Sequence, residues 1–146
     1  MIPKYRAWGV ERYPGLKQPA SKMHRNVSVV TTYPEGITFI LTNFSMQGDD
    51  EYSGSIIDDA ILMQSTGLKD KNGKEIFEGD ILDYKGRKAL VRWHGSYASF
   101  IYRFVDEPHK RKAEWKPLYL AYMKCEIIGN IYENTELLEA IKCTQN

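Results

Sequence analysis

The sequence lacks most of the features that would assign a function directly. Its 2 cysteines, Cys125 and Cys143, form no close-spaced pair with each other or with any of its 3 histidines, so the spacing of a zinc site is missing. A cytosolic protein would keep both thiols reduced. No stretch approaches the roughly 20 apolar residues of a membrane span, and Met1–Arg6 has no apolar core. We therefore expect no secretion signal, no membrane partner and a cytoplasmic location.

Familiar catalytic patterns are absent as well. The chain contains no GxSxG, no HExxH and no glycine-rich phosphate loop. Its net charge of +1 excludes a broad attraction to nucleic acid or membranes, so any such partner needs a local patch. We expect no catalytic residue, no metal and no cofactor, and the balance of these absences leans against an enzyme.

Aromatic residues are abundant, with 10 Tyr, 5 Phe and 3 Trp, and many have β-branched neighbours. This composition favours strands over helices. The 146 residues suit one domain, or one domain with an appendage. We predict a mainly β fold, leaning to α+β, with an N-terminal β-extension over residues 1–60 and a compact part over residues 61–146. A single domain over 1–146 is the alternative.

The N-terminal part is predicted to contain a hairpin between irregular segments. Strands are expected at 5–8, 27–32 and 37–44, and Pro34–Gly36 supplies a turn between the last two. Residues 45–55 are polar and carry two glycines, so we expect them to form an exposed loop.

The C-terminal part is predicted to form a small barrel of about five strands. Strands at 81–84 and 89–93 flank the basic turn Lys85–Arg87, and further strands follow at 99–105, 118–123 and 126–132. Asn134 or Thr135 can cap a short C-terminal helix. Six side chains are expected in the core: Trp93, Phe100, Tyr102, Leu118, Leu120 and Ile127.

The most specific segment is MQSTGLKDKNGKEIFEGDIL, residues 63–82. Asn72-Gly73 is the best turn dipeptide in the chain, because both residues tolerate positive φ. Gly79-Asp80 suits a sharp corner that opens a new strand, where the aspartate can accept hydrogen bonds from local amides. We assign structural roles to these residues and to four others: Gly67, Trp93, Gly129 and Asn130.

Four segments together resemble the YopX family: Tyr5–Trp8, the 63–82 motif, Val91–Trp93, and CEIIGNIYENTELL at 125–138. The resemblance implies a β-rich fold with an SH3-like small barrel in the C-terminal half. With the elements predicted above, the expected fold is this barrel with an N-terminal β-hairpin extension and a short C-terminal helix. The resemblance also implies an origin in bacteriophages or prophages of mainly Gram-positive bacteria, and therefore a bacterial cytoplasm. It carries no activity, cofactor or catalytic residue over to this chain.

Three functions follow as hypotheses. The first is a non-enzymatic binding module that contacts a protein partner, since no catalytic constellation is present and small barrels present loops and edges. The second is a nucleic-acid-binding module, because a basic loop beside an aromatic ring can contact phosphates and stack a base. Its residues are Lys110, Arg111, Lys112, Trp115 and Lys116.

The third and weakest hypothesis is a metal-dependent hydrolase, in which clustered carboxylates hold a divalent ion. Its residues would be Asp49, Asp50, Asp58 or Asp59, and a solvated acidic loop is the simpler interpretation of them. The predicted edge strands are also compatible with homo-oligomerisation.

Overall fold

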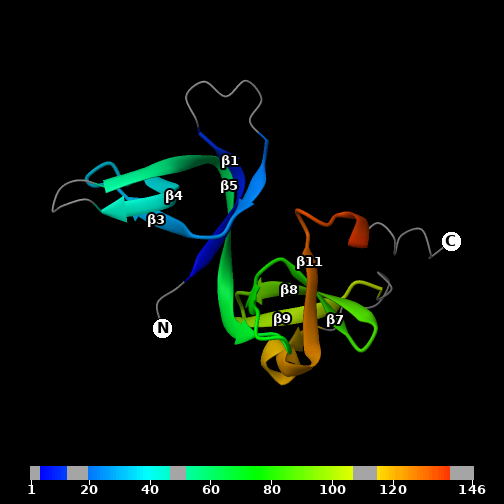
Figure 1. Cartoon of the computed structure of the whole chain (residues 1–146). Helices are drawn as coiled ribbons and strands as arrows, with labels where there is room; N and C mark the ends of the chain where they lie inside the picture. The colour runs from blue at the N-terminus through cyan, green and yellow to red at the C-terminus, as the bar shows by residue number, and fades with distance from the viewer. Residues whose placement is uncertain (1–3, 13–19, 47–51, 107–114, 139–146) are drawn as a thin grey trace. The chain divides into compact units, whose positions relative to one another are not determined.

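The computed structural model describes residues 4–12, 20–46, 52–106 and 115–138 (Figure 1). The chain separates into two compact units, residues 1–64 and residues 65–146. Both are built from antiparallel strands, so the mainly β prediction is confirmed.

Unit 1 is a twisted sheet with the strand order β2-β1-β5-β4-β3. The prediction of a hairpin is confirmed, since β3 and β4 pair and Thr32 N–H donates to the Ile37 carbonyl at 2.8 Å. The strands are β1 (Tyr5–Glu11), β2 (Lys22–His24), β3 (Val27–Thr31), β4 (Thr38–Met46) and β5 (Tyr52–Lys69).

The loop predicted over residues 45–55 is wrong at both of its ends. β4 continues to Met46 and β5 begins at Tyr52, and Ser45 pairs with Ser53. Ladder hydrogen bonds come from the backbone, so a polar sequence can extend a hairpin that its neighbours already hold in register. The remaining part of that prediction lies outside the described residues.

Unit 2 is a second sheet with the order β10-β9-β8-β7-β11, and the end of β5 pairs beside it with β6. Between its described strands the sheet stays open, with β10 and β11 at its edges, and does not close into a ring. The elements are β6 (Glu75–Phe77), β7 (Asp80–Tyr84), β8 (Arg87–His94), β9 (Ser99–Phe104), β10 (Lys116–Pro117), η1 (Leu118–Leu120), η2 (Tyr122–Lys124) and β11 (Cys125–Asn130).

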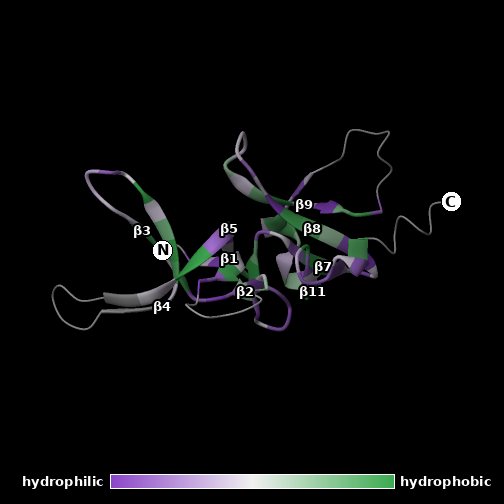
Figure 2. Ribbon diagram, turned by 90° about the horizontal axis from the view of Figure 1, so that it is seen from above, coloured by the Kyte–Doolittle hydropathy of each residue, from purple (hydrophilic) through white to green (hydrophobic). Residues whose placement is uncertain are grey.

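The core of unit 2 lies on one face of this sheet, and Figure 2 shows apolar residues along β8 and β9. Tyr102 and Leu118 are buried as predicted. Phe100 and Ile127 are half-buried against the same cluster. The cluster consists of Ile76, Leu82, Ala89, Val91, Tyr102, Phe104, Leu118, Ala121 and Cys125.

Two core predictions are wrong, because the side chains of Trp93 and Leu120 are 46% and 69% exposed. Alternation along a strand places Trp93 on the same face as the buried Ala89 and Val91. Trp93 is near the end of β8, however, where the sheet extends past the core. The period of two therefore gives the correct face, and only the position along the strand decides burial.

The strand predicted over residues 118–123 is also wrong, because the segment forms the two 3-10 turns η1 and η2. Ala121 N–H donates to the Leu118 carbonyl and Lys124 N–H to that of Ala121, each at 2.9 Å. Buried residues therefore recur at a spacing of three, which a short apolar run does not distinguish from a strand. The C-terminal helix is described only over residues 136–138.

The first part of the 63–82 motif builds a bulge in β5. Gly67 has a φ of +75°, a conformation that glycine adopts without a Cβ clash, and the register against β6 shifts between Ser65 and Lys69. The Thr66 hydroxyl donates to the Ile76 carbonyl at 2.7 Å and accepts from Leu68 N–H at 3.1 Å. This threonine holds the bulge to the β6 strand.

Candidate functional site

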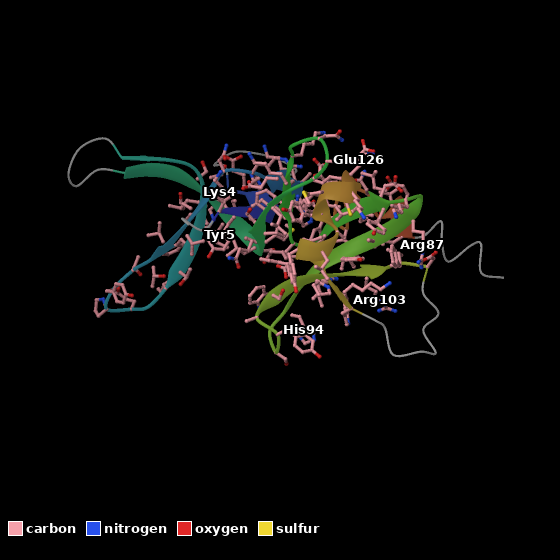
Figure 3. All side chains as sticks on the ribbon, turned by 90° about the horizontal axis from the view of Figure 1, so that it is seen from below. Lys4, Tyr5, Arg87, His94, Arg103 and Glu126 are labelled. Atoms are coloured by element: carbon pink, nitrogen blue, oxygen red, sulfur yellow. The ribbon has the colours of Figure 1, made fainter. Side chains whose placement is uncertain are left out.

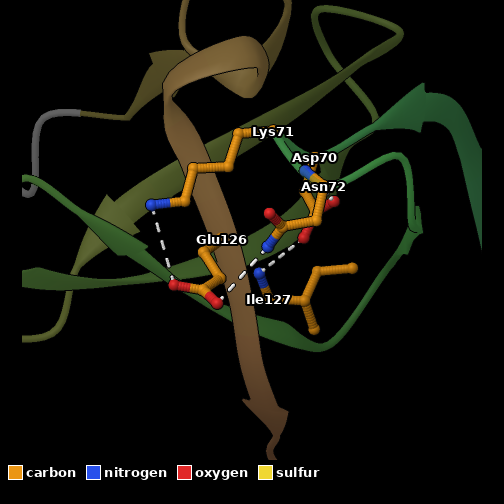
Figure 4. Close-up of polar contacts among 5 residues, drawn as sticks. All are labelled: Asp70, Lys71, Asn72, Glu126 and Ile127. Atoms are coloured by element: carbon orange, nitrogen blue, oxygen red, sulfur yellow. Dashed lines mark hydrogen bonds and ion pairs between the residues drawn. The ribbon is translucent and has the colours of Figure 1, made fainter.

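Asp70 lies at the centre of the connection between β5 and β6. Its carboxylate is buried and accepts hydrogen bonds from the N–H groups of Asn72 and Lys74 at 2.9 Å, and from Ile127 at 3.0 Å. Figure 4 shows it joining the 70–74 turn to β11. Burial opposes its charge, but the bonds from Ile127, Lys74 and Asn72 outweigh burial and lower the pKa of the carboxyl. All three donors are backbone N–H groups of the protein itself, so we assign Asp70 a structural role.

The corner at Gly79-Asp80 uses backbone partners in the same way. Phe77 N–H donates to the Asp80 carboxylate at 2.8 Å, and Gly79 N–H to the Val91 carbonyl at 2.9 Å. Asp80 is buried. Its neighbour Glu78 accepts from Trp93 N–H at 3.3 Å. These contacts fix the entry into β7.

The end of β11 is folded into a tight turn by Asn130. Its side-chain oxygen accepts from the N–H groups of Tyr132 and Glu133 at 3.0 and 2.8 Å. A Cβ on Gly129 would lie 2.6 Å from the Asn134 oxygen, which itself accepts from Asn130 N–H. Gly129 is therefore required by a close approach, and this segment builds a turn.

Of the predicted nucleic-acid residues, Lys110, Arg111 and Lys112 lie outside the described residues. Trp115 and Lys116 are described, and they contact different partners. The Arg103 guanidinium lies 5.8 Å from the Trp115 ring centre, whereas the Lys116 ammonium lies 4.8 Å from that of Phe104. Both are cation–π contacts.

Arg87 approaches the same phenyl ring, with its guanidinium 3.7 Å from the centre of Phe104. It also donates to both carboxylate oxygens of Asp106, at 2.9 and 3.3 Å, and this hydrogen bonding lowers the pKa of Asp106. The Phe104 ring is buried under two cations, and the charge of Arg87 is balanced by a carboxylate. The Phe104 ring is therefore not open for base stacking.

A different group of rings, two of them exposed, lies at the tip of the β8–β9 hairpin. We name Trp93, His94, Tyr97 and Phe100 the aromatic tip. Trp93 packs edge-to-face on Phe100 with ring centres 5.0 Å apart, and His94 stacks on Tyr97 at 4.3 Å. Tyr97 is 72% exposed. Figure 3 places His94 at the far end of β8 from Arg87, so the aromatic tip lies at the opposite end of the strand from the Arg87–Phe104 contact.

The aromatic tip is held in a defined conformation. Tyr97 N–H donates to the His94 Nδ1 at 3.3 Å. Ala98 closes the turn with a φ of +47°, and Ala98 N–H donates to the Gly95 carbonyl at 3.3 Å. Rigid aromatic side chains lose little conformational entropy on binding.

Further apolar side chains lie beside the aromatic tip. β10 pairs with β9 so that Pro117 is opposite Ile101, which directs η1 toward the beginning of β9. The η1 residues Tyr119 and Leu120 are 61% and 69% exposed. Exposed aromatic and aliphatic side chains that gather at one place mark an interaction surface.

The described residues contain no group of three or more His, Cys, Asp and Glu that could hold a metal ion. Asp49 and Asp50 lie outside the described residues. Asp58 forms a two-point ion pair with Arg12, whose hydrogen bond lowers the pKa of that carboxyl. Asp59 is an exposed residue with a φ of +52°. Because both carboxylate oxygens of Asp58 are bonded to Arg12, Asp58 is a poor metal ligand.

Cys125 is a core residue with no exposed surface. Its thiol donates to the Ala121 carbonyl at 3.2 Å, and burial raises the pKa of Cys125 to about 11. A thiol with such a pKa stays protonated at neutral pH, so Cys125 is not an activated nucleophile. In the described part of the chain, no helix is long and apolar enough to span a bilayer.

The fold and its surfaces define a small antiparallel β protein in two units that presents an aromatic tip. Residues 4–139 match the YopX protein family, and the chain belongs to this family. A solved structure, protein EF1440 from Enterococcus faecalis, is 30% identical with a TM-score of 0.58, covering 94% of this chain and 99% of that one. No curated protein matches the chain.

The aromatic tip was missed as a site from the sequence. The sequence predicts Trp93 and Phe100 in the core, and Tyr97 lies in a turn that carries no motif. The available signal is the placement of four rings within eight residues around Gly95. Sequence reasoning also missed the burial of Arg6 and Glu11 in β1.

Proposed function

We propose that this protein is a non-enzymatic accessory module that binds a protein partner through the aromatic tip. The single observation that carries the proposal is the exposure of Trp93 and Tyr97, each of which packs on a neighbouring ring of the aromatic tip: Trp93 on the half-buried Phe100, and Tyr97 on His94. Tryptophan and tyrosine dominate the binding energy of protein interfaces, and a rigid ring is presented at low entropic cost. Tyr119 and Leu120 of η1, which lies near β9, are exposed as well.

The proposal includes the setting that the family resemblance implies. The protein would be encoded by a bacteriophage or prophage and act in the cytoplasm of its bacterial host. Unit 2 would be an open variant of an SH3-like barrel, since its five antiparallel strands follow a meander in which β11 returns beside β7. Barrels of this size use loops and strand ends for recognition.

Removing the exposed rings tests this proposal. We expect the full chain to retain one reproducible host or phage protein on an affinity column, and the Trp93→Ala/Tyr97→Ala variant to lose at least about tenfold of that capture, since a hot-spot ring contributes about 2 kcal/mol. The matched control is Tyr33→Ala, which removes a ring that is 85% exposed in unit 1. Equal capture by the two variants, or no reproducible partner, would contradict the proposal.

A nucleic-acid module is the second proposal, and the proximity of Arg103 to Trp115 favours it. Fluorescence polarisation with labelled single- and double-stranded oligonucleotides should then show affinity that falls steeply with salt. The Lys110→Ala/Arg111→Ala/Lys112→Ala variant should lose this binding. The control removes as many cations elsewhere, as Lys69→Ala/Lys71→Ala/Lys74→Ala. Absence of binding at low salt would retire this proposal.

A further inference from the structure

The outermost strand of unit 1, β3, differs from the other sheet edges among the described strands. β2 has only three residues and carries Lys22, and β10 consists of Lys116 and Pro117. β11 has a register shift between Ile127 and Gly129. Short length, lysine, proline and bulges are the devices by which proteins protect an edge from further pairing.

β3 has none of these protections. It reads Val27-Ser28-Val29-Val30-Thr31, with no charge and no proline, and it keeps one register against β4 along its whole length. Val29 is 41% exposed. Figure 2 shows apolar residues along this strand. Among the described strands β3 pairs with β4 alone.

The pairing with β4 determines which backbone groups of β3 point outward. Thr32 N–H donates to the Ile37 carbonyl, so this pair is of the hydrogen-bonded kind. Such pairs alternate with non-hydrogen-bonded pairs along an antiparallel ladder. Val30 and Ser28 therefore point their N–H and C=O groups toward β4, and Val27, Val29 and Thr31 point theirs to the open edge.

We propose that two copies of this protein associate through β3, pairing antiparallel across a two-fold axis at Val29. In this register Val29 is opposite the partner's Val29, and Val27 is opposite the partner's Thr31. Every outward N–H of one strand then meets an outward C=O of the other, and the two sheets become continuous. An uncharged strand whose outward N–H and C=O groups match those of a second copy is self-complementary, as an isologous interface requires.

Proline at the centre of the interface tests the proposal. The Val29 N–H points outward, so Val29→Pro removes a hydrogen bond between copies and leaves the β3–β4 ladder intact. Light scattering over a concentration series should give twice the mass of one chain for the natural protein and for Val29→Thr. It should give the mass of one chain for Val29→Pro. The proposal would be overturned if the natural protein had the mass of one chain at every concentration, or if the Val29→Pro variant stayed a dimer.

A cysteine placed on the axis tests the register without weakening the strand. Opposed Cα atoms of a hydrogen-bonded pair lie about 5.5 Å apart, within the range of a disulfide. In a Cys143→Ser background, Val29→Cys should form a disulfide-linked dimer under mild oxidation, and Val30→Cys should not, because it is opposite the partner's Ser28. The reverse result, or no cross-link at Val29, would overturn the pairing. This inference is independent of the aromatic tip.

Discussion

Asp70→Asn is expected to lower the free energy of unfolding by about 3 kcal/mol, because hydrogen bonds to a charged group contribute about 1.5–3 kcal/mol each. The carboxylate receives three backbone N–H bonds, from Asn72 and Lys74 on one oxygen and Ile127 on the other. An amide of the same shape must turn its NH₂ group toward one of these donors. Urea unfolding at neutral pH measures the loss.

Surface contacts beside Asp70 provide the control for this variant. Glu126→Ala removes the hydrogen bond from Asn72 at 3.3 Å and the ion pair with Lys71 at 3.7 Å, both shown in Figure 4. These groups are exposed, so the cost should stay below about 1 kcal/mol. Equal losses from Asp70→Asn and Glu126→Ala would show that Asp70 does not join the turn to β11.

The pH dependence of stability should distinguish the contribution of the charge of Asp70 from that of its shape. The folded-state pKa is lower than the ordinary value of 3.8, so the stability that the carboxylate provides is complete above that pH. It is lost as the pH falls through the folded-state pKa. The stability difference between the natural protein and Asp70→Asn should therefore narrow on acidification, and a constant difference would contradict the assignment.

Leu82→Ala should destabilise unit 2 by about 3 kcal/mol, in the range of 2–5 kcal/mol for a buried leucine. Leu82 has no exposed surface and packs in the cluster with Ala89, Val91 and Phe104. Truncation leaves a cavity, because a sheet paired on both sides of β7 cannot collapse around it.

The same substitution at Leu120 is the matched control, since its side chain is 69% exposed in η1. Leu120→Ala should change the free energy of unfolding by less than about 0.5 kcal/mol, the usual limit for a surface substitution. Chemical denaturation followed by circular dichroism measures both variants. A larger loss at Leu120 than at Leu82 would contradict the core described above.

The sequence predicts those parts of this fold that depend on local chemistry. The turn Lys85–Arg87 is a tight hairpin connection with positive φ at Lys85 and Gly86, and Asn72-Gly73 forms a turn in which Gly73 has a φ of +83°. Both depend on which residues tolerate these dihedral angles. The mainly β class follows from composition in the same way.

Other parts were not predictable because they depend on distant partners. The depth of Trp93 depends on where the core ends, and the segment 118–123 forms 3-10 turns because Leu118 and Ala121 both fit that core. The aromatic tip depends on the packing of Trp93 against Phe100 across the hairpin. The sequence pattern of each strand taken alone does not predict this contact. The role of Asp70 likewise requires the contact with Ile127, which is distant in the sequence and which only the folded chain provides.

The long strand β5 has a consequence for any attempt to divide this protein. Gln64 and Ser65, the residues on either side of the division between the units, are neighbours within one strand. Gln64 pairs with Tyr5 of β1, and Ser65 pairs with Phe77 of β6. A cut between them would divide β5, so each half would keep only part of this strand. Because the boundary falls within β5 and not in a linker, we expect that neither half would stay intact as a module when the chain is cut there.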